Sequence, residues 1–178
     1  MPNVCPGING TVIRLERFER ARNGAGRGFP RVRVVIADHQ VLVRAGVRAL
    51  LEERREITVV AEADTAERAV AESARVRPDV VLLDLDLPGI GCDETTRRIL
   101  AHAQAEVMLL TSSATDSRIF PALQAGARGL LLKDTEGEEL SRAVELIARG
   151  QEHLSPTVRR RLMAQLESRA TRSLSLVR

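Results

Sequence analysis

Two spacings of hydrophobic residues alternate along the chain from residue 32 onward. Short apolar runs are typical of strands buried in a parallel sheet, and apolar residues three or four positions apart are typical of helices. The apolar runs predict strands at 32–38, 57–63, 80–85, 106–112 and 128–134. The helical spacing predicts helices at 41–54, 66–77, 93–103, 116–126 and 139–150, and a further helix that begins at Ser155 and Pro156 and extends to about residue 167.

Strands that alternate with helices predict an α/β fold, and inner strands that are apolar on both faces predict a doubly wound, five-stranded parallel sheet. Right-handed crossovers leave few arrangements, and the most frequent order for five strands is 2-1-3-4-5. Such a fold binds ligands outside the carboxyl ends of its strands, at the switch point between the first and third strands. The residues at those strand ends are therefore the candidates for a functional site.

Polar residues and glycines indicate where several helices begin and end. Asp64 or Thr65 is expected to cap the second helix, with Glu67 as the partner in a capping box. Gly126 and Gly150 are expected to close the fourth and fifth helices, because glycine tolerates the left-handed backbone conformation found there.

Four polar residues stand at the carboxyl ends of the predicted strands, and a parallel sheet brings those ends to one edge. They are Asp38, Asp84, Thr111 and Lys133. A buried carboxylate is costly unless it has a partner or a function, so Asp84, inside an apolar run, is the strongest candidate. Asp86, two residues later, is by itself expected only to cap the following helix.

Lys133 is the only lysine among 27 lysine and arginine residues. A compact ammonium differs from a guanidinium in hydration and donor geometry, so its retention at the end of a buried run indicates chemistry. Two carboxylates can bind a hard divalent cation, and a lysine and a threonine hydroxyl suit phosphate oxygens. An Asp carboxylate can itself accept a phosphoryl group, and such transfer needs mainly positioning and charge neutralisation. No glycine-rich phosphate loop occurs, so nucleotide binding is not indicated.

Several segments resemble the response-regulator receiver domains of the CheY-like superfamily. These segments are VVIADHQVLVRAGVRALLE, PDVVLLDLDLPGIG, VMLLTSSA and AGARGLLLKD. Three others are similar to the NarL/FixJ (LuxR-type) branch of that family, namely GLLLKD, AVELIARGQEHLSP and TVRRRL. The resemblance covers about residues 31–162 and implies a flavodoxin-like or CheY-like fold.

The resemblance implies a role for each candidate residue. Asp84 would be the phosphoacceptor, and Thr111 and Lys133 would contact the phosphoryl group. Asp38, Asp84 and the backbone carbonyl of Asp86 would hold Mg²⁺. A sensor histidine kinase would form the aspartyl phosphate in a two-component phosphorelay, and phosphorylation would shift an equilibrium between inactive and active states.

The resemblance also implies how the signal is passed on. A homodimer would form through the first and last receiver helices, and a DNA-binding domain would control transcription. The chain would accept a phosphoryl group on its own Asp and would not be a turnover enzyme.

His39 departs from the family pattern, which usually has two adjacent acids after the first strand. Imidazole is a poor ligand for a hard, oxygen-seeking ion and suits transition metals better. We therefore expect a weakened or lost Mg²⁺ site, in preference to a site for another metal with His39 as a ligand.

Two further departures concern the switch and the loop after the third strand. Leu130 occupies the switch position, where the family commonly has Tyr or Phe, so it offers a smaller change in packing. Cys92 stands where the family more often has Gly, and a positive φ would be unfavourable for it.

The predicted elements divide the chain into three parts. Residues 1–30 show no sustained apolar period and are expected to be a mobile extension. Residues 31–150 are expected to form the receiver, and residues 151–178 are expected to supply a linker helix and tail without a DNA-binding domain. DNA is therefore expected as a partner only if a C-terminal domain is missing from this sequence.

Composition narrows the class of protein further. The formal net charge of +3 is too small to imply nucleic acid, and the absence of Trp and Tyr disfavours a stacking platform for bases. No apolar run approaches the length of a membrane span, and the N-terminus has no signal-peptide pattern. Cys5 and Cys92 have neither disulfide nor metal-ligand spacing, so a cytoplasmic location is expected.

Two functional interpretations remain open from the sequence. The first is a phosphoacceptor receiver that uses Asp38, Asp84, Thr111 and Lys133. The second is an atypical pseudo-receiver, a phosphorylation-independent dimerisation or ligand-binding module, and His39 and Leu130 favour it. A turnover enzyme on the same fold is remote, because no substrate-site signature occurs.

Overall fold

The computed structural model describes residues 31–156, 158–160 and 163–164. Within them, a parallel sheet has the order β2-β1-β3-β4-β5-β6. The strands are β1 (Val32–Ala37), β2 (Ile57–Ala63), β3 (Val80–Asp84), β4 (Glu106–Thr111), β5 (Gly129–Leu132) and β6 (His153–Leu154). The helices are α2 (Val41–Glu52), α3 (Ala66–Val76), α4 (Cys92–Ala103), α5 (Ile119–Gln124) and α6 (Gly137–Ala148).

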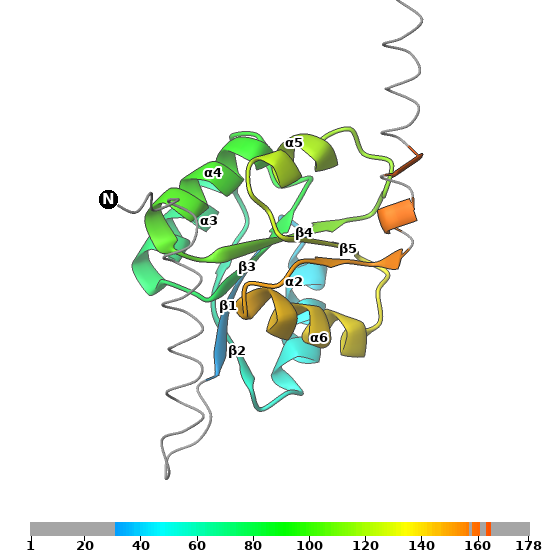
Figure 1. The fold of residues 1–178 in the computed structure, drawn as a ribbon. Coiled ribbons are helices and arrows are strands. Elements are labelled where there is room, and N and C mark those ends of the chain that lie inside the picture. The colour runs from blue at the N-terminus through cyan, green and yellow to red at the C-terminus, as the bar shows by residue number, and fades with distance from the viewer. Residues whose placement is uncertain (1–30, 157, 161–162, 165–178) are drawn as a thin grey trace, which may run out of the picture.

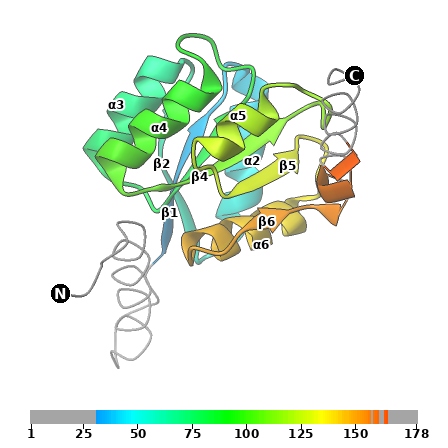
Figure 2. The same cartoon turned by 45° about the horizontal axis from the view of Figure 1, so that its top comes forward.

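Helices cover both faces of the sheet. In Figure 1, α3, α4 and α5 lie on one face and α2 and α6 on the other, and Figure 2 shows the same two layers after a rotation. Each layer encloses its own hydrophobic cluster, one around Leu83 and Leu109 and the other around Leu82 and Met108. Successive residues of a strand point to opposite faces of the sheet, so a strand with apolar residues at every position contributes side chains to both clusters.

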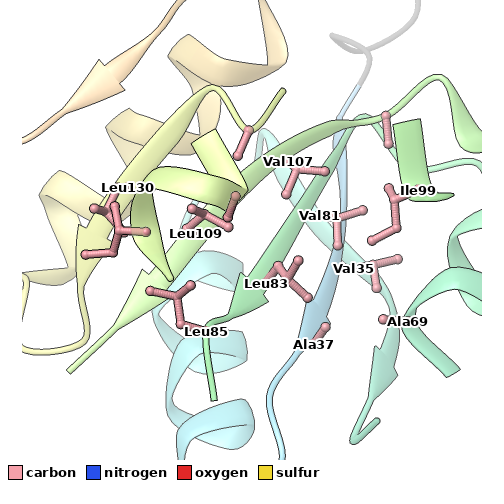
Figure 3. Packing of buried hydrophobic residues seen from close by; sticks show 14 of the residues in the cluster. Val35, Ala37, Ala69, Val81, Leu83, Leu85, Ile99, Val107, Leu109 and Leu130 are labelled. Atoms are coloured by element: carbon pink, nitrogen blue, oxygen red, sulfur yellow. The ribbon is translucent and has the colours of Figure 1, made fainter. Parts of the chain in front are cut away.

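β3 is the most completely buried strand, because all five of its residues are inaccessible to solvent. Figure 3 shows Val81 and Leu83 among the side chains of the neighbouring strands and helices. Each such side chain contributes roughly 1.5–3 kcal/mol of hydrophobic stabilisation. Asp84, the last residue of β3, is therefore held at the end of the most rigidly packed part of the sheet.

The predicted order 2-1-3-4-5 is confirmed, and a short sixth strand extends the sheet beyond it. β6 pairs in parallel with β5 through Gly129 and Leu130, and Val158, a few residues later, is fully buried in the cluster that contains Leu130. A strand of two residues has no detectable period, so the sequence pattern could not reveal it.

Some of the helix ends predicted from the sequence agree with the structure. Thr65 caps α3 and accepts a hydrogen bond from the Arg68 amide. The capping box expected from Glu67 is wrong, because its carboxylate accepts instead from the Ile90 amide in the loop after β3. Gly126 and Gly150 have positive φ, as expected. Cys92 does not, because it forms the first residue of α4, so its side chain is accommodated there without strain.

No helix among the described residues is long and apolar enough to cross a lipid bilayer. The extension expected at residues 1–30 and the end of the helix expected to reach residue 167 fall outside the part of the chain that the structure describes. The start of that last helix is described, since the Ser155 hydroxyl accepts a hydrogen bond from the Val158 amide.

Candidate functional site

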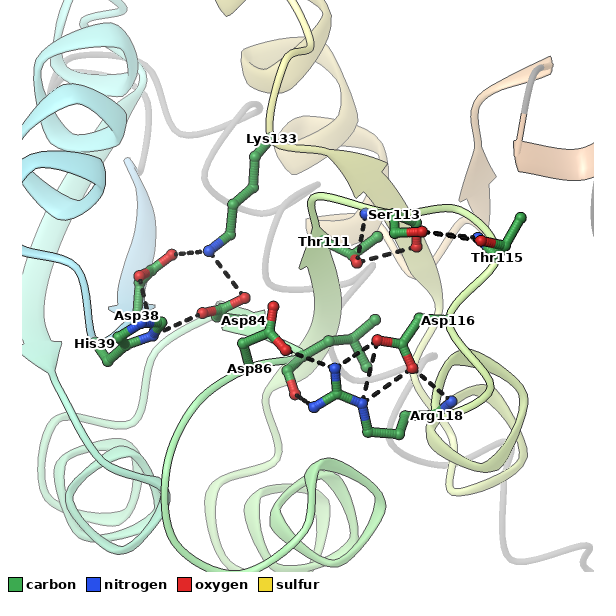
Figure 4. A network of polar contacts seen from close by, with 11 residues as sticks. Asp38, His39, Asp84, Asp86, Thr111, Ser113, Thr115, Asp116, Arg118 and Lys133 are labelled. Carbon is green, nitrogen blue, oxygen red and sulfur yellow. Dashed lines mark hydrogen bonds and ion pairs between the residues drawn. The ribbon is translucent and has the colours of Figure 1, made fainter.

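The carboxyl edge of the sheet brings together the charged residues that the sequence singled out (Figure 4). Asp38 follows β1, Asp84 ends β3, and Lys133 follows β5. His39 lies beside Asp38 in the loop before α2. We call Asp38, His39, Asp84 and Lys133 the acidic cluster.

Lys133 joins the two carboxylates of the acidic cluster. Its Nζ lies 2.7 Å from Asp38 Oδ2 and 2.9 Å from Asp84 Oδ1. Both carboxylates are completely buried, whereas the Lys133 side chain is 11% exposed. Buried charges are tolerated only when they are paired, so the lysine is what allows two acids to occupy this position.

The surroundings of Lys133 act on its pKa in opposite directions. Burial lowers the pKa, whereas the close contacts with the negatively charged carboxylates of Asp38 and Asp84 raise it. The net result is a pKa above the ordinary lysine value. Lys133 therefore carries its positive charge at neutral pH.

His39 takes the remaining oxygen of Asp84. Its Nδ1 lies 3.2 Å from Asp84 Oδ2 and 3.9 Å from Asp38 Oδ1, and its side chain is 41% exposed. An ionised carboxylate can only accept, so this contact requires the proton to be on Nδ1. The amide of Gln40 donates to Asp38 Oδ1 at 2.8 Å. Each of the four carboxylate oxygens therefore faces a donor from the protein itself.

The acidic cluster fits a hard divalent cation poorly. Asp38, His39 and Asp84 can offer three ligand atoms within 4.8 Å of one another. Mg²⁺, however, prefers an octahedron of oxygens, and one of these three atoms is an imidazole nitrogen. A cation on Asp38 Oδ1 and Asp84 Oδ2 would have to displace the Gln40 amide and His39 Nδ1, which already contact these oxygens. The other two carboxylate oxygens make no hydrogen bond and are only ion-paired with Lys133.

Thr111 reaches the same edge of the sheet, but its hydroxyl is engaged elsewhere. It donates to the Ser113 carbonyl and accepts from the Ser113 amide, both at 3.1 Å. The side chain thus turns into its own loop, as Figure 4 shows. Leu130, the expected switch position, is fully buried against the cluster that contains Leu109 and Val158.

Asp86 belongs to a second group of charges, which sequence reasoning missed. Arg118 Nη2 lies 2.5 Å from both Asp86 Oδ1 and Asp116 Oδ2, and its Nη1 donates to the Leu85 carbonyl at 2.9 Å. We call Asp86, Asp116 and Arg118 the Arg118 clamp. It connects the loop after β4 to the chain just beyond Asp84 (Figure 4). Hydrogen bonding to Arg118 lowers the pKa of Asp116, although burial opposes the shift.

Cys92 lies near Asp84 but is not suited to chemistry. Burial raises the pKa of its thiol to about 12, with a further contribution from the negative charge of Asp84, although a hydrogen bond with Thr96 opposes the shift. The thiolate is the reactive form of cysteine, so this side chain is inert at neutral pH.

Comparison with known proteins places this geometry in a family. The model of the response regulator receiver domain matches residues 34–145. The response regulator GacA of Pseudomonas viridiflava is 35% identical over 132 residues, which cover 74% of this chain and 62% of GacA. The response regulator UvrY of Escherichia coli is 35% identical over 145 residues, which cover 80% of this chain and 66% of UvrY. The chain thus spans less than two thirds of the length of GacA.

Solved structures agree with these relatives. The signal receiver domain of NarL from Mycobacterium tuberculosis has a TM-score of 0.65 and 33% identity, covering 68% of this chain and 99% of that one. A LuxR-family two-component response regulator from Aurantimonas sp. SI85-9A1 has a TM-score of 0.70 and 33% identity, covering 76% and 97%.

Proposed function

This chain belongs to the response-regulator receiver family, and we propose that it is switched by transfer of a phosphoryl group from a histidine kinase to Asp84. The observation that carries the proposal is the position of Asp84. It is a completely buried carboxylate at the carboxyl end of the central strand, held by the only lysine of the chain.

The proposed transfer uses the chemistry of the acidic cluster. A carboxylate oxygen of Asp84 forms a bond to phosphorus while the bond from phosphorus to the kinase imidazole breaks. The imidazole nitrogen leaves with the electron pair. Charge on the phosphoryl oxygens is met by the ammonium of Lys133, which is positioned for this before the donor arrives.

Thr111 and Leu130 are proposed to couple phosphorylation of Asp84 to a change in conformation of the loop after β4. In the described state the Thr111 hydroxyl bonds within its own loop. A phosphoryl group on Asp84 would offer it a stronger, charged acceptor, and the loop would follow the hydroxyl. Leu130 belongs to the same hydrophobic cluster as Ala114 of this loop and would adjust its packing, which would shift the equilibrium toward the active state.

The surface beside the acidic cluster supports a kinase as the partner. Val41 and Leu42, the first two residues of α2, are 66% and 86% exposed and lie two and three residues after His39. Exposed apolar side chains next to a reactive centre are typical of a docking surface for another protein. Response regulators work with histidine kinases, and we propose a homodimer through α2 and α6 as the further partner.

The proposed output is control of transcription. GacA and UvrY are longer than the matched region, so a separate DNA-binding domain is part of the proposal. The second candidate function is the pseudo-receiver, and the contact of His39 with Asp84 favours it because it occupies the oxygen that a phosphoryl group needs.

An intact-mass measurement distinguishes the two functions. The chain is incubated with acetyl phosphate and Mg²⁺, and we expect the added mass of one phosphoryl group. Asp84→Asn should remove the addition, and the matched variant Asp86→Asn, which changes an exposed acid of the same loop, should retain it. Phosphoryl uptake by Asp84→Asn would show that the acceptor is another residue. No uptake by the folded wild type, with acetyl phosphate or a kinase, would favour the pseudo-receiver.

A further inference from the structure

We propose that this receiver accepts its phosphoryl group without a divalent cation, because His39 supplies the electrostatic contact that a metal would otherwise supply. The inference rests on the proposed function, since it concerns the same transfer to Asp84. It follows from how the acidic cluster is assembled, and its first step is the occupancy of the carboxylate oxygens.

All four carboxylate oxygens of Asp38 and Asp84 face a donor, two of them through hydrogen bonds and two through ion pairs with Lys133 that lack hydrogen-bond geometry. Lys133 Nζ contacts one oxygen of each, at 2.7 and 2.9 Å. The Gln40 amide holds the second oxygen of Asp38, and His39 Nδ1 holds the second oxygen of Asp84. Mg²⁺ sheds its water reluctantly and prefers oxygen ligands, so it would have to break these contacts in exchange for an incomplete coordination shell.

The charge of the acidic cluster leads to the same inference. Lys133 offsets one of the two buried carboxylates, and His39 adds no negative charge of its own. An acid in place of His39 would raise the net charge of the acidic cluster, the acceptor Asp84 included, from about −1 to about −2, and a divalent cation would then be needed to let a phosphate approach. The substitution therefore halves the net negative charge that a divalent cation would have to offset.

His39 is also positioned to contact the phosphoryl group once it is bound to Asp84. Its imidazole is 41% exposed, in contrast with the completely buried carboxylate that it contacts. When an Asp84 oxygen attacks acetyl phosphate, it forms a bond to phosphorus and the bond from phosphorus to the acetyl oxygen breaks. Acetate leaves with the electron pair, and no proton is transferred. The Nδ1–H of His39 can then donate to a phosphoryl oxygen in place of the Asp84 oxygen that it held.

The test compares phosphorylation with and without a metal. The full chain is incubated with acetyl phosphate, and in parallel with phosphoramidate, in Mg²⁺ or in excess EDTA, and the modified fraction is followed by intact mass. We expect the wild-type rates in the two conditions to agree within about twofold, because no charge-stabilising contact depends on the metal. His39→Asp should be phosphorylated at least about tenfold faster with Mg²⁺ than with EDTA.

Two other variants separate the role of His39 from a general effect on the fold. His39→Ala should lower the metal-free rate about tenfold or more, the effect of losing one hydrogen bond to developing charge. His102→Ala, at an exposed position on α4, should leave both rates unchanged. Calorimetric titration with Mg²⁺ gives a readout independent of the reaction, and we expect measurable binding to His39→Asp and none to the wild type at the same concentrations.

The outcomes are distinct from those that test the proposed function. Wild-type phosphorylation that requires Mg²⁺, or Mg²⁺ binding equal to that of His39→Asp, would overturn the metal-free inference and leave Asp84 as the acceptor. Absence of phosphorylation in every condition, with both donors and a folded protein, would overturn the proposed function and the inference with it.

Discussion

The acidic cluster and the Arg118 clamp both include an acid at or just beyond the end of β3, and the same residue types behave differently in each. Asp84 and Asp86 are two residues apart, yet Asp84 is completely buried whereas the Asp86 side chain is 46% exposed. Their cations differ in the same way, since the side chain of Lys133 is 11% exposed and that of Arg118 is 50% exposed. The ion-pair distances are similar, so solvent access is what separates the two groups.

Burial determines what each group can contribute. In the acidic cluster, burial separates the charges from solvent, so each charge is stabilised by its protein partners. The positions of these side chains are therefore fixed. In the Arg118 clamp, water can replace any lost partner, so the ion pairs add little stability and can open at low cost. A rigid group suits chemistry on Asp84, and a weakly held group suits a loop that must move afterwards.

The largest expected effect comes from removing the cation of the acidic cluster. Lys133→Met should lower the free energy of unfolding by about 3–5 kcal/mol, because the buried carboxylates of Asp38 and Asp84 lose the cation that offsets their charge. Urea denaturation measures the difference. Arg128→Met is the matched control, since the Arg128 side chain pairs with Glu106 but is 34% exposed, and it should cost no more than about 1 kcal/mol. Equal losses in the two variants would contradict the comparison.

A smaller effect should appear at alkaline pH. The pKa of Lys133 is raised above 10.5 in the folded protein. Its ion pairs therefore contribute fully below about pH 10.5, and their contribution is lost as the pH rises through the folded pKa. The buried Cys92 thiol also has a raised pKa, so stability should be measured in a Cys92→Ala background.

The composition of the chain makes this pH dependence a specific measure of Lys133. There is no tyrosine and no second lysine, and arginine does not titrate in this range. Urea denaturation of Cys92→Ala should show the free energy of unfolding decreasing above about pH 10.5. The double variant with Lys133→Met should have a flatter dependence on pH. A steep decline that persists in the double variant would mean that another group is responsible.

The smallest effect on stability is expected at the Arg118 clamp. Arg118→Ala should change the free energy of unfolding by no more than about 1 kcal/mol, because its ion pairs are exposed. Hydrogen exchange at residues 112–118 should nevertheless become faster, since Arg118 ties this loop to the Leu85 carbonyl. Arg97→Ala, whose ion pairs lie within α4, is the control and should leave that loop unchanged. Unchanged exchange in Arg118→Ala would show that the clamp does not restrain the loop.

The residues at strand ends could be predicted from the sequence, whereas the contacts made by loop residues could not. The strand order follows from apolar runs and crossover handedness, and the strand ends then place Asp38, Asp84 and Lys133 at one edge. The direction of the Thr111 hydroxyl could not be predicted, because a hydroxyl chooses among nearby acceptors by local geometry. Arg118 was missed because it stands at the start of α5, in a stretch expected to be helical, and its partner Asp86 is distant in sequence. Its only signal was an arginine close to Asp116, a common arrangement on protein surfaces.

β6 also affects how the protein behaves in concentrated solution. Without it, β5 would form the edge of the sheet and would present the backbone of an apolar strand, Gly129–Leu132, to other molecules. Unpaired apolar edges are templates for strand addition between chains, which leads to aggregation. The two residues of β6 pair with Gly129 and Leu130 and so cover the first half of that edge. For this reason, a shortened protein that ends before His153 would be prone to precipitate even though every residue of the acidic cluster is retained.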